Sequence, residues 1–91
     1  MTHDRSAIIE TVQKFVLREF LPEEDPAMLT ASTPLIKGAI LDSIATVKLV
    51  TFLEKEYGVE FQPHEMSVDY LDTLADISKV ISEKLARKDR V

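Results

Sequence analysis

Few residues in this chain have types and spacings that support chemistry, and the most notable is Ser43, which directly follows Asp42. Taken alone, this dipeptide fits an ordinary helix N-cap, because Asp and Ser side chains accept hydrogen bonds from the first backbone N–H groups of a helix. A hydrolytic serine needs a neighbouring base and a glycine-flanked nucleophile turn. The only histidines are His3 and His64, and no such turn surrounds Ser43, so the sequence predicts no catalytic residue.

Neither a metal site nor thiol chemistry is expected from the chain itself. It contains no cysteine, which excludes disulfides, cysteine-based zinc sites and a cysteine nucleophile. Two isolated histidines lack the ligand spacing of a zinc site. Asp69, Asp72 and Asp76 lack the glycine and the ligand order of a calcium loop, so we interpret them as a solvated acidic face.

Length, composition and charge restrict the class of protein. The 91 residues are 45% hydrophobic and 30% charged, as expected of one small globular domain over residues 1–91. The net charge of −5 argues against a nucleic acid partner. No stretch reaches the roughly 20 apolar residues that cross a membrane. We therefore expect a cytoplasmic monomer whose partners are other proteins.

An all-α bundle of three long helices and one short helix is expected to position Asp42 and Ser43. Apolar residues recur every three or four positions in the long segments, and Pro63 begins the short helix. The predicted helices cover residues 5–20, 43–57, 63–68 and 73–87. A loop of about twenty residues separates the first two, and loops of this length in small domains are usually functional. Four aliphatic residues are expected to fix this loop to the core: Leu35, Ile36, Ile40 and Leu41.

The second helix has two distinct faces on a helical wheel. The core face consists of Thr46, Leu49, Val50, Leu53 and Tyr57. The opposite face consists of Ile44, Val47, Lys48, Thr51 and Lys55, with Glu54 at its edge. Single exposed aliphatic residues need no explanation, but two of them beside Ser43 favour contact with another protein. We predict a docking face formed by Ile44, Val47, Lys48, Thr51 and Glu54.

The region around Ser43 reads GAILDSI over residues 38–44 and resembles the acyl and peptidyl carrier proteins. In that family, Asp-Ser and a large aliphatic residue begin the second helix. The resemblance extends over nearly the whole chain, including the long loop, the glycine after the second helix and the short third helix. It implies that Ser43 carries 4′-phosphopantetheine, transferred from coenzyme A by a separate Mg²⁺-dependent transferase. Asp42 would cap the helix and contact the Mg²⁺ during transfer.

The resemblance also implies a function without catalysis. The thiol of the arm on Ser43 would hold acyl or aminoacyl groups as thioesters for specialised lipid, polyketide, peptide or aminoacyl-transfer metabolism. The implied partners are a phosphopantetheinyl transferase, an acyl- or amino-acid-activating ligase, and a synthase or acyltransferase. Part of the cargo is expected to fold back between the second and third helices, near Phe61 and Val68. The alternative is an unmodified helical adaptor that acts only by binding.

A phosphodiester on Ser43 would agree with the physics of a helix N-terminus. The free backbone N–H groups and the positive end of the helix dipole favour an anion there. The preceding turn, with Gly38 and Leu41, is similar to the turn of standalone aminoacyl and D-alanyl carriers, whereas fatty-acid carriers have a shorter Gly-x-Asp-Ser turn. Some peptidyl carriers have the same turn, so this similarity favours an aminoacyl-type carrier but does not determine the cargo.

The charge of the second helix supports the same interpretation. Fatty-acid carriers usually present an acidic second helix, but here Ala45, Lys48 and Lys55 are expected on the exposed face. The acidic residues instead concentrate between Glu54 and Asp76, a segment with seven acidic residues and one lysine. Recognition by general enzymes of fatty acid biosynthesis is therefore not expected.

Overall fold

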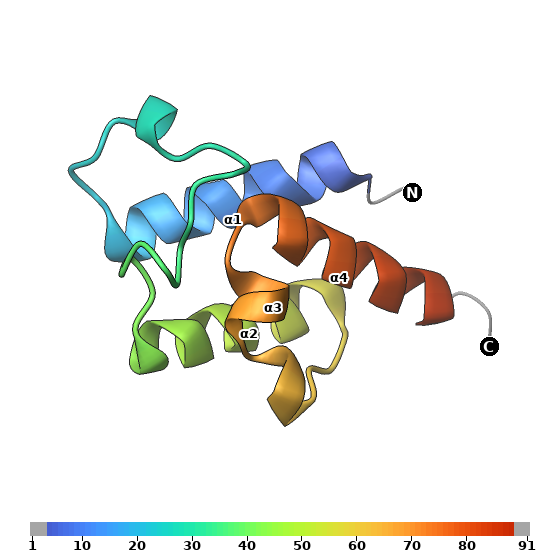
Figure 1. Ribbon diagram of the computed structural model, residues 1–91. Helices are drawn as coiled ribbons and strands as arrows, with labels where there is room; N and C mark the ends of the chain where they lie inside the picture. The colour runs from blue at the N-terminus through green and yellow to red at the C-terminus, as the bar shows by residue number, and fades with distance from the viewer. Residues whose placement is uncertain (1–3, 89–91) are drawn as a thin grey trace.

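The computed structural model describes residues 4–88, and its regular structure within this range is entirely helical. Three long α-helices and one short α-helix are joined by loops that contain two 3₁₀ turns, η1 and η2 (Figure 1). In chain order the elements are α1 (Arg5–Phe20), η1 (Pro26–Met28), α2 (Ser43–Tyr57), η2 (Pro63–Glu65), α3 (Val68–Leu71) and α4 (Leu74–Lys88). This arrangement confirms the small helical bundle expected from the sequence.

The ends of the long helices are determined by local hydrogen bonds. The Asp4 carboxylate accepts a hydrogen bond from the Ala7 N–H at 2.8 Å at the start of α1. The Thr73 hydroxyl accepts one from the Asp76 N–H at 3.0 Å in the first turn of α4. Gly58 ends α2 with φ 64°, a left-handed conformation in which a side chain would be strained. These short-range features explain why helix ends can be located from sequence.

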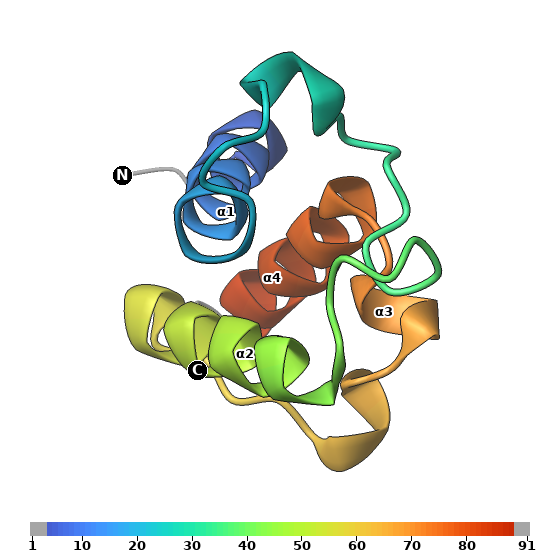
Figure 2. The same cartoon turned by 90° about the vertical axis from the view of Figure 1, so that its left-hand side faces the viewer.

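The core lies between α1, α2 and α4, and α3 covers one side of it (Figure 2). All five residues of the predicted core face of α2 are buried. Phe15 of α1 stacks on Phe52 of α2, with ring centroids 4.1 Å apart. Burial of each large apolar side chain contributes about 1.5–3 kcal/mol. The least exposed large side chains are Ile8, Leu35, Leu49, Leu53, Leu71, Leu74, Ile77 and Ile81.

The predicted short helix over residues 63–68 is wrong in its position. Pro63 begins only a 3₁₀ turn, which ends at Glu65, and the short helix α3 starts three residues later at Val68. Ser67 separates the two elements because its backbone is extended, with φ −132° and ψ 172°. Its carbonyl then accepts the hydrogen bonds that start α3, from the N–H groups of residues 70 and 71. Burial of Leu71 in the core fixes the position of α3.

The long loop between α1 and α2 is tied to the core, as its aliphatic residues predict. Leu35 and Leu41 are buried, and Ile36 and Ile40 are half-buried. The loop crosses one end of the bundle before it enters α2 (Figure 2). The anchored loop therefore gives Asp42 and Ser43 a defined position at the start of α2.

Candidate cofactor attachment site

Asp42 and Ser43 have different structural roles at the start of α2. Asp42 is the N-cap, and its Oδ1 accepts a hydrogen bond from the Ala45 N–H at 2.7 Å. Its carbonyl oxygen also accepts bonds from the N–H of Thr46 at 2.9 Å and from the hydroxyl of Thr46 at 2.8 Å. Of the two candidate caps, the structure therefore assigns Asp42, and Ser43 is the first residue inside the helix.

Ser43 is exposed and free for chemistry. Its hydroxyl makes no hydrogen bond to any other residue within 4–88. The N–H groups of Ser43 and Ile44 likewise donate to no acceptor in residues 4–88, because the Asp42 carboxylate accepts its bond from the Ala45 N–H instead. Unpaired N–H groups at the positive end of a helix dipole favour a negative charge near Ser43.

The turn that leads to Asp42 is closed by backbone hydrogen bonds. The carbonyl of Leu35 accepts bonds from the N–H groups of Ile40 at 2.8 Å and Leu41 at 2.9 Å. Gly38 is required here because a Cβ atom would overlap the Pro34 carbonyl oxygen. Ala39, not Gly38, adopts the left-handed conformation, with φ 62°. The glycine of the sequence motif thus serves close packing of the backbone.

Asp72, at the junction of α3 and α4, holds the same turn from the other side. Its Oδ1 accepts hydrogen bonds from the N–H groups of Ile36 at 3.0 Å and Lys37 at 2.9 Å. The Asp72 carbonyl also accepts a bond from the Leu35 N–H. Only 8% of Asp72 is exposed, so the prediction that it belongs to a solvated face is wrong. In the sequence, the only local indication that Asp72 is buried is its position between Leu71 and Leu74, which are both buried.

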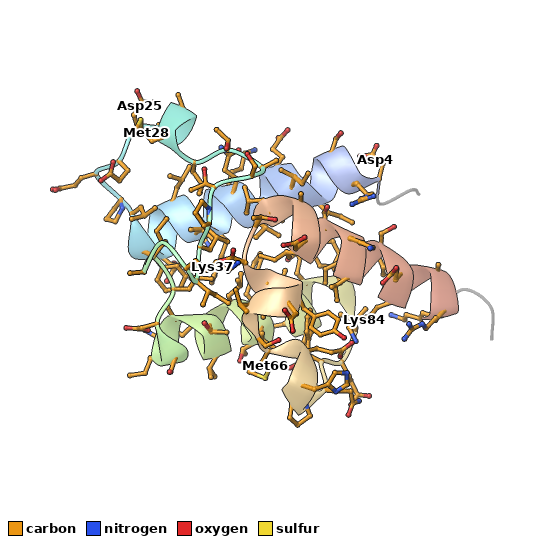
Figure 3. All side chains as sticks on the ribbon, viewed as in Figure 1. Asp4, Asp25, Met28, Lys37, Met66 and Lys84 are labelled. Atoms are coloured by element: carbon orange, nitrogen blue, oxygen red, sulfur yellow. The ribbon has the colours of Figure 1, made fainter. Side chains whose placement is uncertain are left out.

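A groove of about 510 Å³ opens beside Ser43, between α2 and the segment that leads into α3. Its lining residues are Ile36, Leu41, Asp42, Ser43, Thr46, Val47, Met66, Ser67 and Val68. Figure 3 shows Met66 at the side of the molecule formed by η2 and α3. Val68 lines the groove, whereas Phe61 is buried and does not, and the expectation that cargo folds back here stays a prediction.

An ion pair between Glu65 and Lys84 attaches η2, the turn beside the groove, to α4. Lys84 Nζ lies 2.7 Å from Glu65 Oε1 and 4.9 Å from the centre of the Phe61 ring. The Gln62 N–H donates to the same carboxylate oxygen at 2.7 Å. Burial alone would raise the pKa of Glu65, but the bond from Gln62 and the Lys84 ammonium outweigh it, so this pKa lies below its ordinary value. The pair holds η2, directly before Met66, against the bundle.

Comparison with known proteins identifies the family. A family model described as a phosphopantetheine attachment site matches residues 14–81. The chain belongs to this family of carrier proteins. It is 31% identical to the acyl carrier protein of Caulobacter vibrioides over 81 residues, which are 89% of this chain and 99% of the relative. It is 29% identical to the acyl carrier protein of Phenylobacterium zucineum over 80 residues, which are 88% of this chain and 96% of the relative.

Membership of the carrier family implies a covalently attached 4′-phosphopantetheine. Attachment through a phosphodiester needs an accessible hydroxyl, and the exposed, unbonded hydroxyl of Ser43 fits this requirement. The groove next to it offers space for an extended arm. Both relatives are named acyl carrier proteins, so the similarity of the turn to aminoacyl carriers stays a prediction.

The outer face of α2 in this carrier is only partly as predicted. Ile44 and Val47 are 70% and 53% exposed, and Lys48, Thr51 and Lys55 are exposed as well. Ala45 is buried, so the prediction that it belongs to this face is wrong. Glu54 is half-buried, and its Oε2 accepts a hydrogen bond from the Phe61 N–H at 2.9 Å. Glu54 lies about 16 Å along the helix from Ser43, at 1.5 Å per residue.

The remaining candidates for chemistry do not assemble into a site in the described part of the carrier. His64 is exposed, and its ring lies 5.8 Å from the Tyr70 ring between centroids, while His3 lies outside the described residues. Residues 4–88 contain no group of three or more acidic, histidine or cysteine side chains placed to bind a metal ion. In the same range no helix combines the length and the apolar character needed to span a membrane.

Proposed function

We propose that this chain is a discrete carrier protein in which the Ser43 hydroxyl bears 4′-phosphopantetheine. The terminal thiol of that arm would hold acyl or aminoacyl groups as thioesters and present them to partner enzymes. The observation that carries this proposal is the exposed and unbonded hydroxyl at the first residue of α2, beside a groove of about 510 Å³. The chain itself performs no catalysis in this proposal, and it acts as a cytoplasmic monomer.

Attachment uses the chemistry of Ser43 together with a separate transferase. The Ser43 oxygen forms a bond to the phosphorus next to the pantetheine of coenzyme A, the pyrophosphate linkage breaks, and adenosine 3′,5′-bisphosphate leaves. The hydroxyl proton passes to a base of the transferase. One Asp42 oxygen stays bonded to Ala45, and the other accepts no bond from residues 4–88, so it is free to contact the Mg²⁺ of the transferase.

The attachment can be located directly by mass spectrometry. After incubation with coenzyme A, Mg²⁺ and a phosphopantetheinyl transferase, we expect the intact chain to gain the mass of one phosphopantetheine. Fragmentation should place the added mass on the segment that contains Ser43. A control without coenzyme A should show no gain. No gain with an active transferase would favour the unmodified adaptor, and a gain located on another residue would exclude Ser43 as the site.

The cargo is an acyl or aminoacyl group, and two observations bear on the choice. The groove beside Ser43 is lined largely by aliphatic side chains and Met66, and the relatives are named acyl carrier proteins; both support an apolar acyl group. The turn that contains Gly38 supports an aminoacyl group. The loading partner is accordingly an acyl- or amino-acid-activating ligase, and the receiving partner is a synthase or an acyltransferase.

Partner enzymes would dock on the outer face of α2, at Ile44, Val47, Lys48, Thr51 and Glu54. The first four are exposed and lie within eight residues of Ser43, which is slightly more than two helical turns. Glu54 has a second role, because its carboxylate is bonded to the Phe61 N–H. The aliphatic pair Ile44 and Val47 supplies apolar area, and Lys48 supplies a charge that selects acidic partner surfaces.

Substitutions on this face are expected to weaken transfer without unfolding the bundle. Ile44→Ala and Lys48→Glu should each lower kcat/KM for the phosphopantetheinyl transferase by about tenfold, as for the loss of an interface contact worth roughly 1–2 kcal/mol. Lys79→Glu on α4 is the matched control, because it makes the same charge change at an exposed residue on another helix. Unchanged kcat/KM in both variants, or an equal loss in Lys79→Glu, would contradict the docking face.

A further inference from the structure

One strongly exposed apolar side chain lies away from the docking face of α2. Within residues 4–88 the exposed large apolar residues are Met28, Ile44 and Val47. The last two belong to the outer face of α2, but Met28 is part of η1 and is 69% exposed. Figure 3 shows Met28 and Asp25 together at the edge of the molecule beyond α1, far from Met66 on the groove side. Met28 therefore belongs to a separate surface.

The turn that carries Met28 is held firmly. The Asp25 carboxylate accepts a hydrogen bond from the Ala27 N–H at 2.9 Å, and Pro26 fixes the first residue of the turn. The Gln13 side chain of α1 donates bonds to the carbonyl oxygens of Pro26 at 3.2 Å and Leu29 at 2.7 Å. An exposed side chain on an anchored turn loses less conformational freedom on binding than one on a flexible loop.

A small hollow lies directly beside Met28. Its volume is about 150 Å³, and its lining residues are Leu21, Glu24, Asp25, Met28, Leu29 and Ile40. Four of these six side chains are apolar. An apolar cavity of about 150 Å³ accommodates a benzene ring. The hollow is thus the right size for one leucine or phenylalanine side chain, and it is too small for a long acyl chain.

The rim of the hollow is acidic. Glu23, Glu24 and Asp25 are all exposed, and the chain has four acidic residues and no lysine or arginine between residues 19 and 36. The nearest preceding cation in sequence, Arg18, is already paired with Glu19 at 3.2 Å. The exposed charged residues on the outer face of α2 are Lys48 and Lys55, whereas Glu54 at its edge is half-buried and bonded to the Phe61 N–H, so this face has the opposite character. One partner patch cannot complement both surfaces.

We propose that Leu21, Glu24, Asp25, Met28 and Ile40 form a second docking surface, the Met28 surface. Its occupant is a partner protein segment that presents one large aliphatic or aromatic side chain flanked by lysine or arginine. The apolar side chain fills the hollow against Met28, and the flanking cations face the carboxylates of residues 23–25. Because this surface is separate from the α2 face, such a segment holds the chain while Ser43 is presented elsewhere.

The proposal can be tested with the full chain, without cofactor, and a synthetic helical peptide that has one leucine between lysines. In a titration followed by NMR, we expect shifts concentrated at residues 21–29 and 40. Peptides with alanine for the leucine, or glutamate for the lysines, should bind at least about tenfold more weakly. Shifts confined to the outer face of α2, or equal binding of the three peptides, would overturn the proposal.

Variants separate specific docking from general attraction between opposite charges. Glu24→Lys and Met28→Ala should weaken binding of the lysine–leucine peptide by about tenfold and fivefold, and Met28→Leu should restore it to within about twofold. Glu56→Lys, at an exposed residue of α2, makes the same charge change as Glu24→Lys and should leave binding nearly unchanged. Equal losses in both lysine variants, or no loss in Met28→Ala, would contradict the Met28 surface. Circular dichroism confirms that each variant is folded.

Discussion

Ser43→Ala is expected to abolish loading with phosphopantetheine and to leave the free energy of unfolding within about 0.5 kcal/mol of the wild type. The first effect follows from the proposed attachment, since alanine has no oxygen to bond to phosphorus. The second follows from the structure: Asp42 caps α2, and the Ser43 hydroxyl makes no hydrogen bond within residues 4–88. A serine needed only for folding would instead lose stability when replaced by alanine, without being the residue that is modified.

Intact mass after incubation with coenzyme A and the transferase measures the first effect, and chemical denaturation measures the second. Ser6→Ala is a matched control, because Ser6 is also exposed in the first turn of a helix capped by aspartate. That variant should load fully. Continued loading of Ser43→Ala would exclude Ser43 as the site, and a stability loss above about 1 kcal/mol would give the serine a structural role.

Asp42→Ala and Asp42→Asn separate capping from a role in the transfer. The alanine variant should lose about 1 kcal/mol of stability, because the Ala45 N–H loses its partner. The asparagine variant keeps an oxygen for this bond but removes the carboxylate that we propose contacts Mg²⁺. It should fold normally and load more slowly. Normal loading of Asp42→Asn would restrict Asp42 to the cap.

The sequence was sufficient for the long helices because their signals are local. The caps at Asp4 and Asp42 and the left-handed Gly58 act within four residues of the helix ends. The apolar periodicity of α2 likewise identifies its buried face, apart from Ala45 at the margin. For the site, the short motif around Ser43 was informative since it lies at one of these well-marked helix ends.

Contacts between distant segments could not be predicted in this way. The bonds from Ile36 and Lys37 to Asp72 join residues more than thirty positions apart, and no spacing rule connects them. The pairing of Lys84 with Glu65 similarly depends on how η2 packs against α4. Because these long-range contacts hold the loop and η2 in place, the motif indicated Ser43 as the candidate residue but not the structure that positions it.

Asp72→Ala is expected to destabilise the fold by about 2–3 kcal/mol. Two backbone N–H groups, those of Ile36 and Lys37, lose their bonds to a charged acceptor, and such bonds contribute roughly 1.5–3 kcal/mol each when buried. We expect a total at or just below the lower end of the summed range of about 3–6 kcal/mol, because both bonds are only partly buried and water reaches the freed groups. Chemical denaturation with an unchanged m-value would measure this loss.

The same variant tests whether Asp72 positions the attachment site. Release of the turn at Ile36 and Lys37 should speed hydrogen exchange of these two amides and reduce loading at Ser43 under conditions where the variant is still folded. Asp72→Asn keeps an acceptor oxygen and should lose only about 1 kcal/mol, because a neutral acceptor forms weaker bonds. Asp69→Ala, at an exposed residue of α3, should leave stability and loading nearly unchanged. If Asp72→Ala exchanges and loads like the wild type, the backbone hydrogen bonds and the burial of Leu35 and Leu41 are sufficient to hold the turn, and the Asp72 carboxylate has no part in presenting the serine.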